Sequence, residues 1–108
     1  MSFKQGDIVI TNLSHTVGHE QAGQRPVLVM SKDLFNANTK QIVVCPITSK
    51  AKPLPMRLPL DERTKTQGYI LCDQMRTLDA IARTPRFVER LPEDLLEIVK
   101  QTTSAIII

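Results

Sequence analysis

The chain has 108 residues, 42% of them hydrophobic, and carries a formal net charge of +3 with a pI near 9.1. This length suits one domain and excludes two independent cores, and the apolar fraction excludes extensive disorder. The positive balance favours an anionic partner, although ordinary solubilising charge would produce the same value.

The first half of the chain predicts three strands. Residues 7–13 are rich in Ile and Val and run into a turn, and residues 26–30 form a second short apolar run. Between them, residues 15–24 form a polar loop that is long enough to carry function. Residues 36–40 supply turn chemistry, and residues 41–48 are a β-branched run in which Pro46 suggests a bulge or an edge position.

The second half continues with short strands separated by charged loops. Residues 50–55 contain two Lys and two Pro and should be exposed, residues 56–60 are a weak strand, and residues 61–67 form a charged loop closed by Gly68. Residues 69–74 predict a clear strand, and residues 75–82 predict another after a bend near Met75. The chain therefore predicts five to seven short strands.

A helix is expected at the C-terminal end. Pro92 followed by Glu93 and Asp94 is a typical helix start, because acidic groups suit the positive end of the helix dipole. The apolar run at residues 106–108 should pack within the chain, with a dimer contact as the alternative. The apolar residues that fit one helical face are Leu95, Leu96, Val99, Ala105 and Ile106.

These elements predict a mainly β, α+β fold of one domain, in which a curled antiparallel sheet or barrel carries a C-terminal helix. No stretch of about 18 apolar residues and no signal sequence occurs, so a cytoplasmic location is expected. Cys45 and Cys72 lie in separate apolar runs without a second Cys two residues away. We expect both thiols to be buried and reduced.

Three polar clusters are candidates for chemistry, since no Gly-rich phosphate loop, nucleophile elbow or zinc-binding helix motif occurs. In residues 18–26, Gly-His-Glu-Gln-Ala-Gly-Gln-Arg-Pro, Arg25 lies where a polar loop meets a strand, and its guanidinium suits a phosphate. In residues 46–50, Thr48 and Ser49 offer hydroxyl donors before a Lys. A surface cation and a simple turn are the alternative interpretations.

The third cluster is residues 72–79, Cys-Asp-Gln-Met-Arg-Thr-Leu-Asp. Strand alternation would place Asp73 and Met75 on one side and Gln74 and Arg76 on the other. Asp73 could equally be a buried acid satisfied by backbone amides.

The order and spacing of these clusters closely resemble the MazF/PemK toxin family over nearly the whole chain. The shared elements are an opening Gly-Asp strand, the Gly-x-Glu-Gln-x-Gly-x-Arg-Pro segment at residues 18–26, Pro-x-Thr-Ser at residues 46–49, and Asp-Gln-x-Arg-Thr-x-Asp at residues 73–79. The resemblance implies an SH3-like barrel, a homodimer and the toxin of a type II toxin-antitoxin module. It further implies metal-independent cleavage of single-stranded RNA without a cofactor, restrained by a MazE/PemI-like antitoxin.

The resemblance also implies roles for particular residues. Arg25 and Thr48 are the best catalytic matches, while His19, Ser49 and Asp73 match residues implicated in the PemK/Kid branch. Leu71 stands where that branch has an Arg, so the general acid would be Arg25, His19 or water. The residues expected to bind RNA are Glu20, Gln21, Lys50, Lys52, Arg57, Gln74 and Arg76.

Rival interpretations follow from the same resemblance. Gyrase-targeting CcdB toxins share the architecture but depend on a C-terminal Trp-Gly-Ile, whereas this chain has no Trp and ends in three Ile. A non-catalytic peptide-binding adaptor would need an aromatic groove, and only 4% of the residues are aromatic. Because Leu71 stands where the PemK/Kid branch has an Arg, an inactive relative of these toxins is a further alternative. Phe35 and Tyr69 are the obvious candidates for base stacking, although core packing is the favoured expectation for both.

Overall fold

The computed structural model describes residues 2–13, 23–50 and 52–108. Within these residues, seven strands form one antiparallel sheet in the order β4-β5-β3-β2-β1-β7, with β6 also paired to β3. The strands are β1 (Asp7–Asn12), β2 (Gln24–Val29), β3 (Gln41–Thr48), β4 (Arg57–Pro59), β5 (Tyr69–Leu71), β6 (Arg76–Asp79) and β7 (Arg86–Arg90). The helical elements are α1 (Asp33–Thr39), the short 3-10 helix η1 (Cys72–Gln74) and α2 (Glu93–Ile107).

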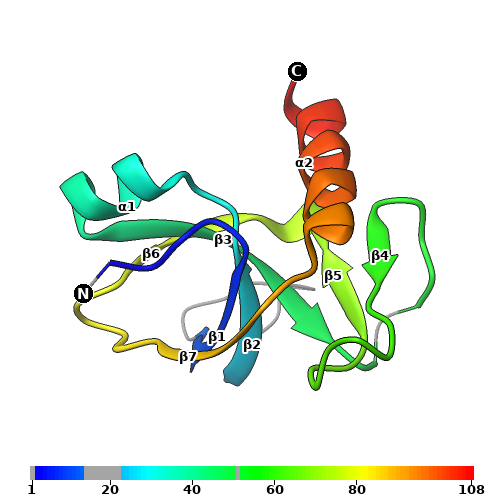
Figure 1. Ribbon diagram of the computed structural model, residues 1–108, viewed down its shortest axis with the longest axis horizontal. Coiled ribbons are helices and arrows are strands. Elements are labelled where there is room, and N and C mark those ends of the chain that lie inside the picture. The colour runs from blue at the N-terminus through cyan, green and yellow to red at the C-terminus, as the bar shows by residue number, and fades with distance from the viewer. Residues whose placement is uncertain (1, 14–22, 51) are drawn as a thin grey trace.

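The sheet curls into a barrel-like shape that is open between β4 and β7, with α2 standing against it (Figure 1). The mainly β fold with a C-terminal helix is therefore confirmed. The long strand β3 organises the sheet, because it pairs with β2 along one edge and with β6 and then β5 along the other.

Of the two alternatives for Pro46, a bulge or an edge position, the edge position was wrong, because Pro46 lies in this central strand. It is paired with Val27 of β2, and it stands between the part of β3 that pairs with β6 and the part that pairs with β5. A proline has no amide hydrogen to donate, and the change of partner at this point removes the need for one.

Strand alternation divides the buried apolar residues between the two faces of the sheet. One cluster includes Ile8, Leu28 and Ile47, and α2 covers it through Leu96 and Val99. The cluster on the other face consists of Val9, Leu13, Val27, Val29, Ile42, Val44 and Leu78. The face without α2 is the one on which the candidate site is found.

Helix α1 replaces the turn that was expected at residues 36–40. The helix begins after Lys32, whose backbone is extended, and ends at Thr39. The next residue, Lys40, has a left-handed φ of 58°. Asn36 explains the difference, because its amide donates to the carbonyl oxygens of Phe3 and Ser31 at 2.9 and 3.1 Å. A residue that favours turns is thus buried in a tertiary hydrogen-bond network.

The strand expected at residues 69–74 ends early, at Leu71, and η1 forms the bend that was expected before Met75. Because η1 is helical, the alternation predicted for Asp73, Gln74 and Met75 does not apply. The strand β7 was not predicted, since its sequence Arg-Phe-Val-Glu-Arg has no clear apolar alternation. It forms through pairing with β1.

The start of α2 was predicted correctly, but its buried face was only partly so. Leu96 and Val99 are buried with Thr103, whereas Ala105 and Ile106 are exposed. The last turns of α2 project beyond the sheet (Figure 1), so the expected packing of residues 106–108 within the chain was wrong.

Cys45 and Cys72 are buried and free, as expected. A hydrogen bond between the two thiols, together with burial, raises the pKa of Cys45 above its ordinary value, which keeps that thiol neutral. None of the described helices has the length and apolar character needed to cross a membrane.

Candidate functional site

The face of the sheet opposite α2 carries several of the expected site residues. Strands β2 and β3 pair with Val27 opposite Pro46, and continuing this register by two residues brings Arg25 to the level of Thr48. On the other edge of β3, Arg76 pairs with Val44. Arg25 and Arg76 are both half-buried.

Thr48 is nearly buried, with 4% of its surface exposed, and Ser49 is exposed. The Thr48 hydroxyl oxygen accepts a hydrogen bond from the backbone N–H of Lys50 at 3.2 Å. The expected turn at this point is therefore present. Because the hydroxyl acts there as an acceptor, its own hydrogen can still be donated to another group.

Gly68 packs directly against this turn. Its φ is +117°, and a Cβ at this position would lie 2.3 Å from the Thr48 carbonyl oxygen and 2.7 Å from the Ser49 nitrogen. The neighbouring carbonyl of Gly68 accepts a hydrogen bond from the Leu60 N–H at 2.8 Å. A residue without a side chain is required for this approach.

Asp73 lies in η1, immediately after β5, with 37% of its side chain exposed. Its Oδ2 accepts a hydrogen bond from the Arg57 guanidinium at 3.4 Å, and the two groups form an ion pair. Arg57 comes from β4 and is much less exposed, at 18%. The structure thus joins a predicted catalytic residue to a predicted RNA-binding residue.

The basic segment after β3 is exposed, as expected, at Lys50 and Lys52. Arg57 differs from these lysines because its side chain is directed to Asp73 and is largely covered. Gln74 is half-buried. His19, Glu20 and Gln21 lie outside the described residues.

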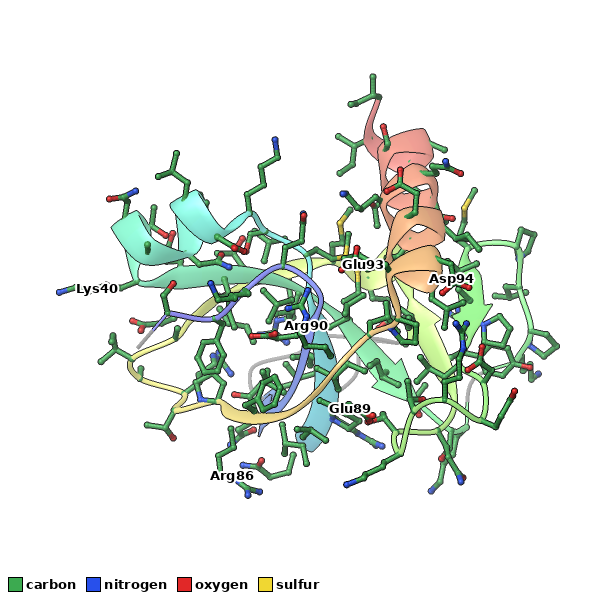
Figure 2. The ribbon with its side chains drawn as sticks, viewed as in Figure 1. Lys40, Arg86, Glu89, Arg90, Glu93 and Asp94 are labelled. Atoms are coloured by element: carbon green, nitrogen blue, oxygen red, sulfur yellow. The ribbon has the colours of Figure 1, made fainter. Side chains whose placement is uncertain are left out.

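Arg83 and Arg90, which lie before and at the end of β7, make contacts that hold the fold together. Arg90 donates to the Asp7 carboxylate at 2.8 Å and lies near Glu93 at the start of α2 (Figure 2). Arg83 donates to the Asn12 carbonyl at 2.6 Å. Arg86 is exposed on β7.

Glu89 anchors the loop between β4 and β5, which sequence reasoning did not foresee. Its carboxylate accepts hydrogen bonds from the Thr66 hydroxyl at 2.7 Å and from the backbone N–H groups of Thr66 and Lys65. Burial raises the pKa of Glu89, but these hydrogen bonds outweigh burial and hold the pKa below its ordinary value. The loop that ends at Gly68 is thereby tied to β7.

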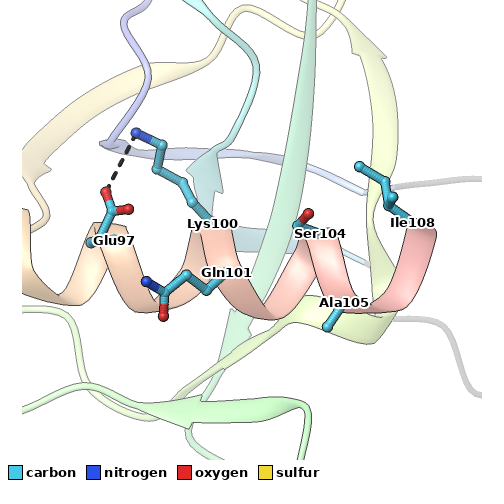
Figure 3. A pocket seen from close by; sticks show the side chains of 6 residues that line it. All are labelled: Glu97, Lys100, Gln101, Ser104, Ala105 and Ile108. Carbon is cyan, nitrogen blue, oxygen red and sulfur yellow. Dashed lines mark ion pairs between the residues drawn. The ribbon is translucent and has the colours of Figure 1, made fainter.

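A second surface lies on the projecting end of α2. Ile106, Ile107 and Ile108 are 41%, 68% and 99% exposed, and Ile98 is 46% exposed on the same helix. An open depression follows this part of the helix, and Figure 3 shows the residues that line it: Glu97, Lys100, Gln101, Ser104, Ala105 and Ile108. Glu97 and Lys100 form an ion pair at 3.7 Å. Three consecutive exposed Ile at the end of a helix are typical of a surface that another molecule covers.

The described residues contain no group of three or more His, Cys, Asp or Glu side chains arranged to hold a metal ion. The chemistry available on the sheet face comes from guanidinium, hydroxyl and carboxylate groups. A guanidinium with a neighbouring hydroxyl suits a phosphate, and a carboxylate can accept a proton.

A family model described as PemK-like, MazF-like toxin of type II toxin-antitoxin system matches residues 4–107. The Escherichia coli endoribonuclease PemK is 38% identical over 108 residues, which span 96% of this chain and 81% of that protein. The Bacillus subtilis endoribonuclease EndoA is 34% identical over 107 residues, which span 94% of this chain and 90% of that protein.

Solved structures agree with these sequence matches. The crystal structure of MazF from Deinococcus radiodurans superposes with a TM-score of 0.91 at 32% identity, covering 98% of this chain and 96% of that one. A structure of the MazE-MazF complex from the same organism superposes with a TM-score of 0.84 at 28% identity, covering 98% and 95% of the two chains. The similarity therefore extends over the whole fold.

Proposed function

The chain belongs to the PemK-like, MazF-like toxin family of type II toxin-antitoxin systems, and we propose that it is an endoribonuclease that cleaves single-stranded RNA without a metal ion. The observation that carries the proposal is the common sheet face of Arg25 and Thr48, in a chain whose relatives are named endoribonucleases. Cleavage of messenger RNA in the cytoplasm would stop translation and growth.

The proposed reaction is transesterification within the RNA chain. A base, Asp73 or His19, removes the proton from a ribose 2′-OH, and the 2′-oxygen attacks the adjacent phosphorus. The bond from phosphorus to the 5′-oxygen breaks, and that oxygen takes a proton from Arg25, His19 or water. The products carry a 2′,3′-cyclic phosphate and a 5′-OH, so RNA is required because DNA lacks the nucleophile.

Arg25 has the role of stabilising the negative charge that develops on the phosphate, and Thr48 and Ser49 donate hydrogen bonds to a non-bridging oxygen. The half-burial of Arg25 supports this role, since a guanidinium that is partly shielded from water interacts more strongly with an anion. The free donor capacity of the Thr48 hydroxyl is consistent with the same geometry.

The RNA strand follows the basic segment beside this site. Lys50 and Lys52 are exposed there and can contact successive phosphates. The remaining groups proposed to contact the RNA are Glu20, Gln21, Gln74 and Arg76. Tyr69, half-buried and paired with Thr48 in the sheet, offers a ring for a base to stack on.

Two protein partners are part of the proposal. An antitoxin of the MazE/PemI type would cover the RNA groove with an acidic segment, which the net charge of +3 favours. Complexes of the related MazF with MazE support such a partner. A second copy of the chain would cover the exposed isoleucines of α2 and form a homodimer.

Cleavage of a long single-stranded RNA in the presence of EDTA tests the proposed activity. We expect discrete cuts whose products carry 2′,3′-cyclic phosphate and 5′-OH ends. The matched substrate is an oligonucleotide with one 2′-deoxyribose at the cut position, which should resist cleavage there. Products with 3′-OH ends, or equal cleavage of the deoxy substrate, would disprove the transesterification mechanism.

A further inference from the structure

Arg57 is held next to Asp73 by the backbone. Its strand β4 pairs with β5 so that Arg57 lies opposite Leu71, two residues before Asp73. The Cys72 N–H also donates to the Met56 carbonyl at 3.1 Å, which fixes the start of η1 against the residue before Arg57. The Cα of Arg57 is therefore anchored at the junction of β5 and η1.

The side chain of Arg57 is oriented by packing as well as by charge. Leu58 belongs to the face that α2 covers, so strand alternation directs Arg57 to the opposite face, with Leu71. Its Nε is buried without a hydrogen-bond partner among the described residues, and one of its terminal nitrogens contacts Oδ2 of Asp73. A guanidinium so covered has little freedom to move away from this carboxylate.

Asp73, in contrast, lies on a three-residue helical turn and is exposed enough to meet a substrate. A carboxylate in that setting can rotate between several rotamers, and a covered cation that contacts one oxygen restricts the rotation. The contact uses Oδ2 and does not occupy Oδ1. The 3.4 Å distance is long, as hydrogen bonds of catalytic groups often are before substrate binds.

We propose that Arg57 is a positioning residue that orients the Asp73 carboxylate toward the RNA 2′-OH, and that it is not a phosphate contact like the neighbouring lysines. This inference rests on the proposed ribonuclease function. A positioning role predicts that Arg57 affects the chemical step through Asp73, whereas a phosphate contact would affect RNA binding.

Steady-state kinetics with a short fluorescent RNA substrate test this assignment on Arg57→Ala, Asp73→Asn and the double variant. We expect Arg57→Ala to lower kcat about ten- to a hundredfold with KM within about twofold, because misplacing a reacting group costs up to about a hundredfold. In the Asp73→Asn background the same change should have no further effect, since it acts through the carboxylate. Arg57→Lys should restore part of the rate.

Lys52→Ala provides the contrast, because loss of a phosphate contact should raise KM and flatten the salt dependence of RNA binding. The same behaviour from Arg57→Ala, with kcat unchanged, would overturn the proposal, and so would a full additional loss in the Asp73→Asn background. Thermal unfolding shows whether each variant is folded. If Arg57→Ala fails to fold, the kinetics of Arg57→Lys distinguish the positioning role from a phosphate contact. If the wild type cuts RNA and the Arg57 variants cut it equally well, this inference alone is contradicted. If the folded wild type cuts no RNA, the proposed function is contradicted as well.

Discussion

At the scale of single residues, the Thr48–Ser49 turn depends on Gly68. Gly68 immediately precedes β5 and the turn lies at the end of β3. The two backbones approach so closely that any side chain at Gly68 would meet Thr48 and Ser49 backbone atoms. The left-handed φ of Gly68 adds a second requirement for glycine. The placement of the proposed phosphate-binding hydroxyls is therefore set partly by a residue with no chemistry of its own.

Gly68→Ala should lower the free energy of unfolding by about 2 to 3 kcal/mol, because it combines backbone strain with a clash that only backbone movement relieves. It should also slow RNA cleavage at temperatures where the variant is folded. Urea unfolding and single-turnover cleavage measure the two effects.

Gly23→Ala is the matched control for stability. Its φ is +80°, but no atom of the described residues lies within 4 Å of the added Cβ, so only the backbone cost of about 1 to 2 kcal/mol should appear. If the two variants lose equal stability, the contact between Gly68 and the Thr48–Ser49 turn is not what constrains that position.

The sequence was sufficient to propose Arg25, Thr48 and Asp73 as candidate site residues, because their order along the chain matches a family pattern. It could not indicate the Arg57–Asp73 ion pair, which joins residues 16 apart and depends on the register of β4 and β5. Nor could it show that Gly68, expected only to close a loop, lies against the backbone of Thr48 and Ser49. Such contacts are properties of strand pairing.

At the scale of elements, the end of α2 is the clearest departure from expectation. The apolar period was correct through Leu96 and Val99, where the helix lies on the sheet, and failed at Ala105 and Ile106, where it has left the sheet. Periodicity identifies a face of a helix but does not tell how far the covering surface extends. The exposed residues are explained if a second copy covers them.

Ile107→Asp should convert the proposed homodimer to monomer. Burying an isoleucine stabilises by about 1.5 to 3 kcal/mol, and the change occurs in both copies, so dimerisation should weaken at least about a hundredfold. Sedimentation velocity over a concentration series measures the shift. Ile81→Asp is the matched control, since Ile81 is 65% exposed in the turn after β6 and should leave the dimer intact. A wild-type monomer, or a dimer of unchanged affinity in Ile107→Asp, would contradict this interface.

Among the other elements, those with a clear local sequence pattern were predicted, and those that depend on tertiary contacts were missed. The strands β1, β2 and β3 were evident from their apolar runs, and η1 was anticipated as a bend. Helix α1 was missed because the turn-forming Asn36 finds its partners in Phe3 and Ser31. Strand β7 was missed because pairing with β1, and not its own sequence, makes it a strand.

In the whole molecule, the proposed dimer surface and the candidate site lie on opposite faces of the curled sheet. One face is covered by α2, whose projecting end offers the proposed dimer surface. The opposite face holds Arg25 on β2 and Thr48 on β3, with Arg57 and Asp73 where β4, β5 and η1 meet. We therefore expect activity to depend on the identity of residues on one face, and not on positive charge in general.

Cleavage of single-stranded RNA in EDTA by Arg25→Ala and by Arg86→Ala separates the effect of residue identity from that of positive charge. Both variants lose one arginine. Arg86 is exposed on β7 and pairs with Ile10 of β1, whereas Arg25 pairs with the next residue, Thr11. Strand alternation therefore directs the two arginines to opposite faces of the sheet. We expect the cleavage rate to fall about a hundredfold or more for Arg25→Ala and to stay close to wild type for Arg86→Ala. Full activity in folded Arg25→Ala, or an equal loss in both variants, would contradict this expectation.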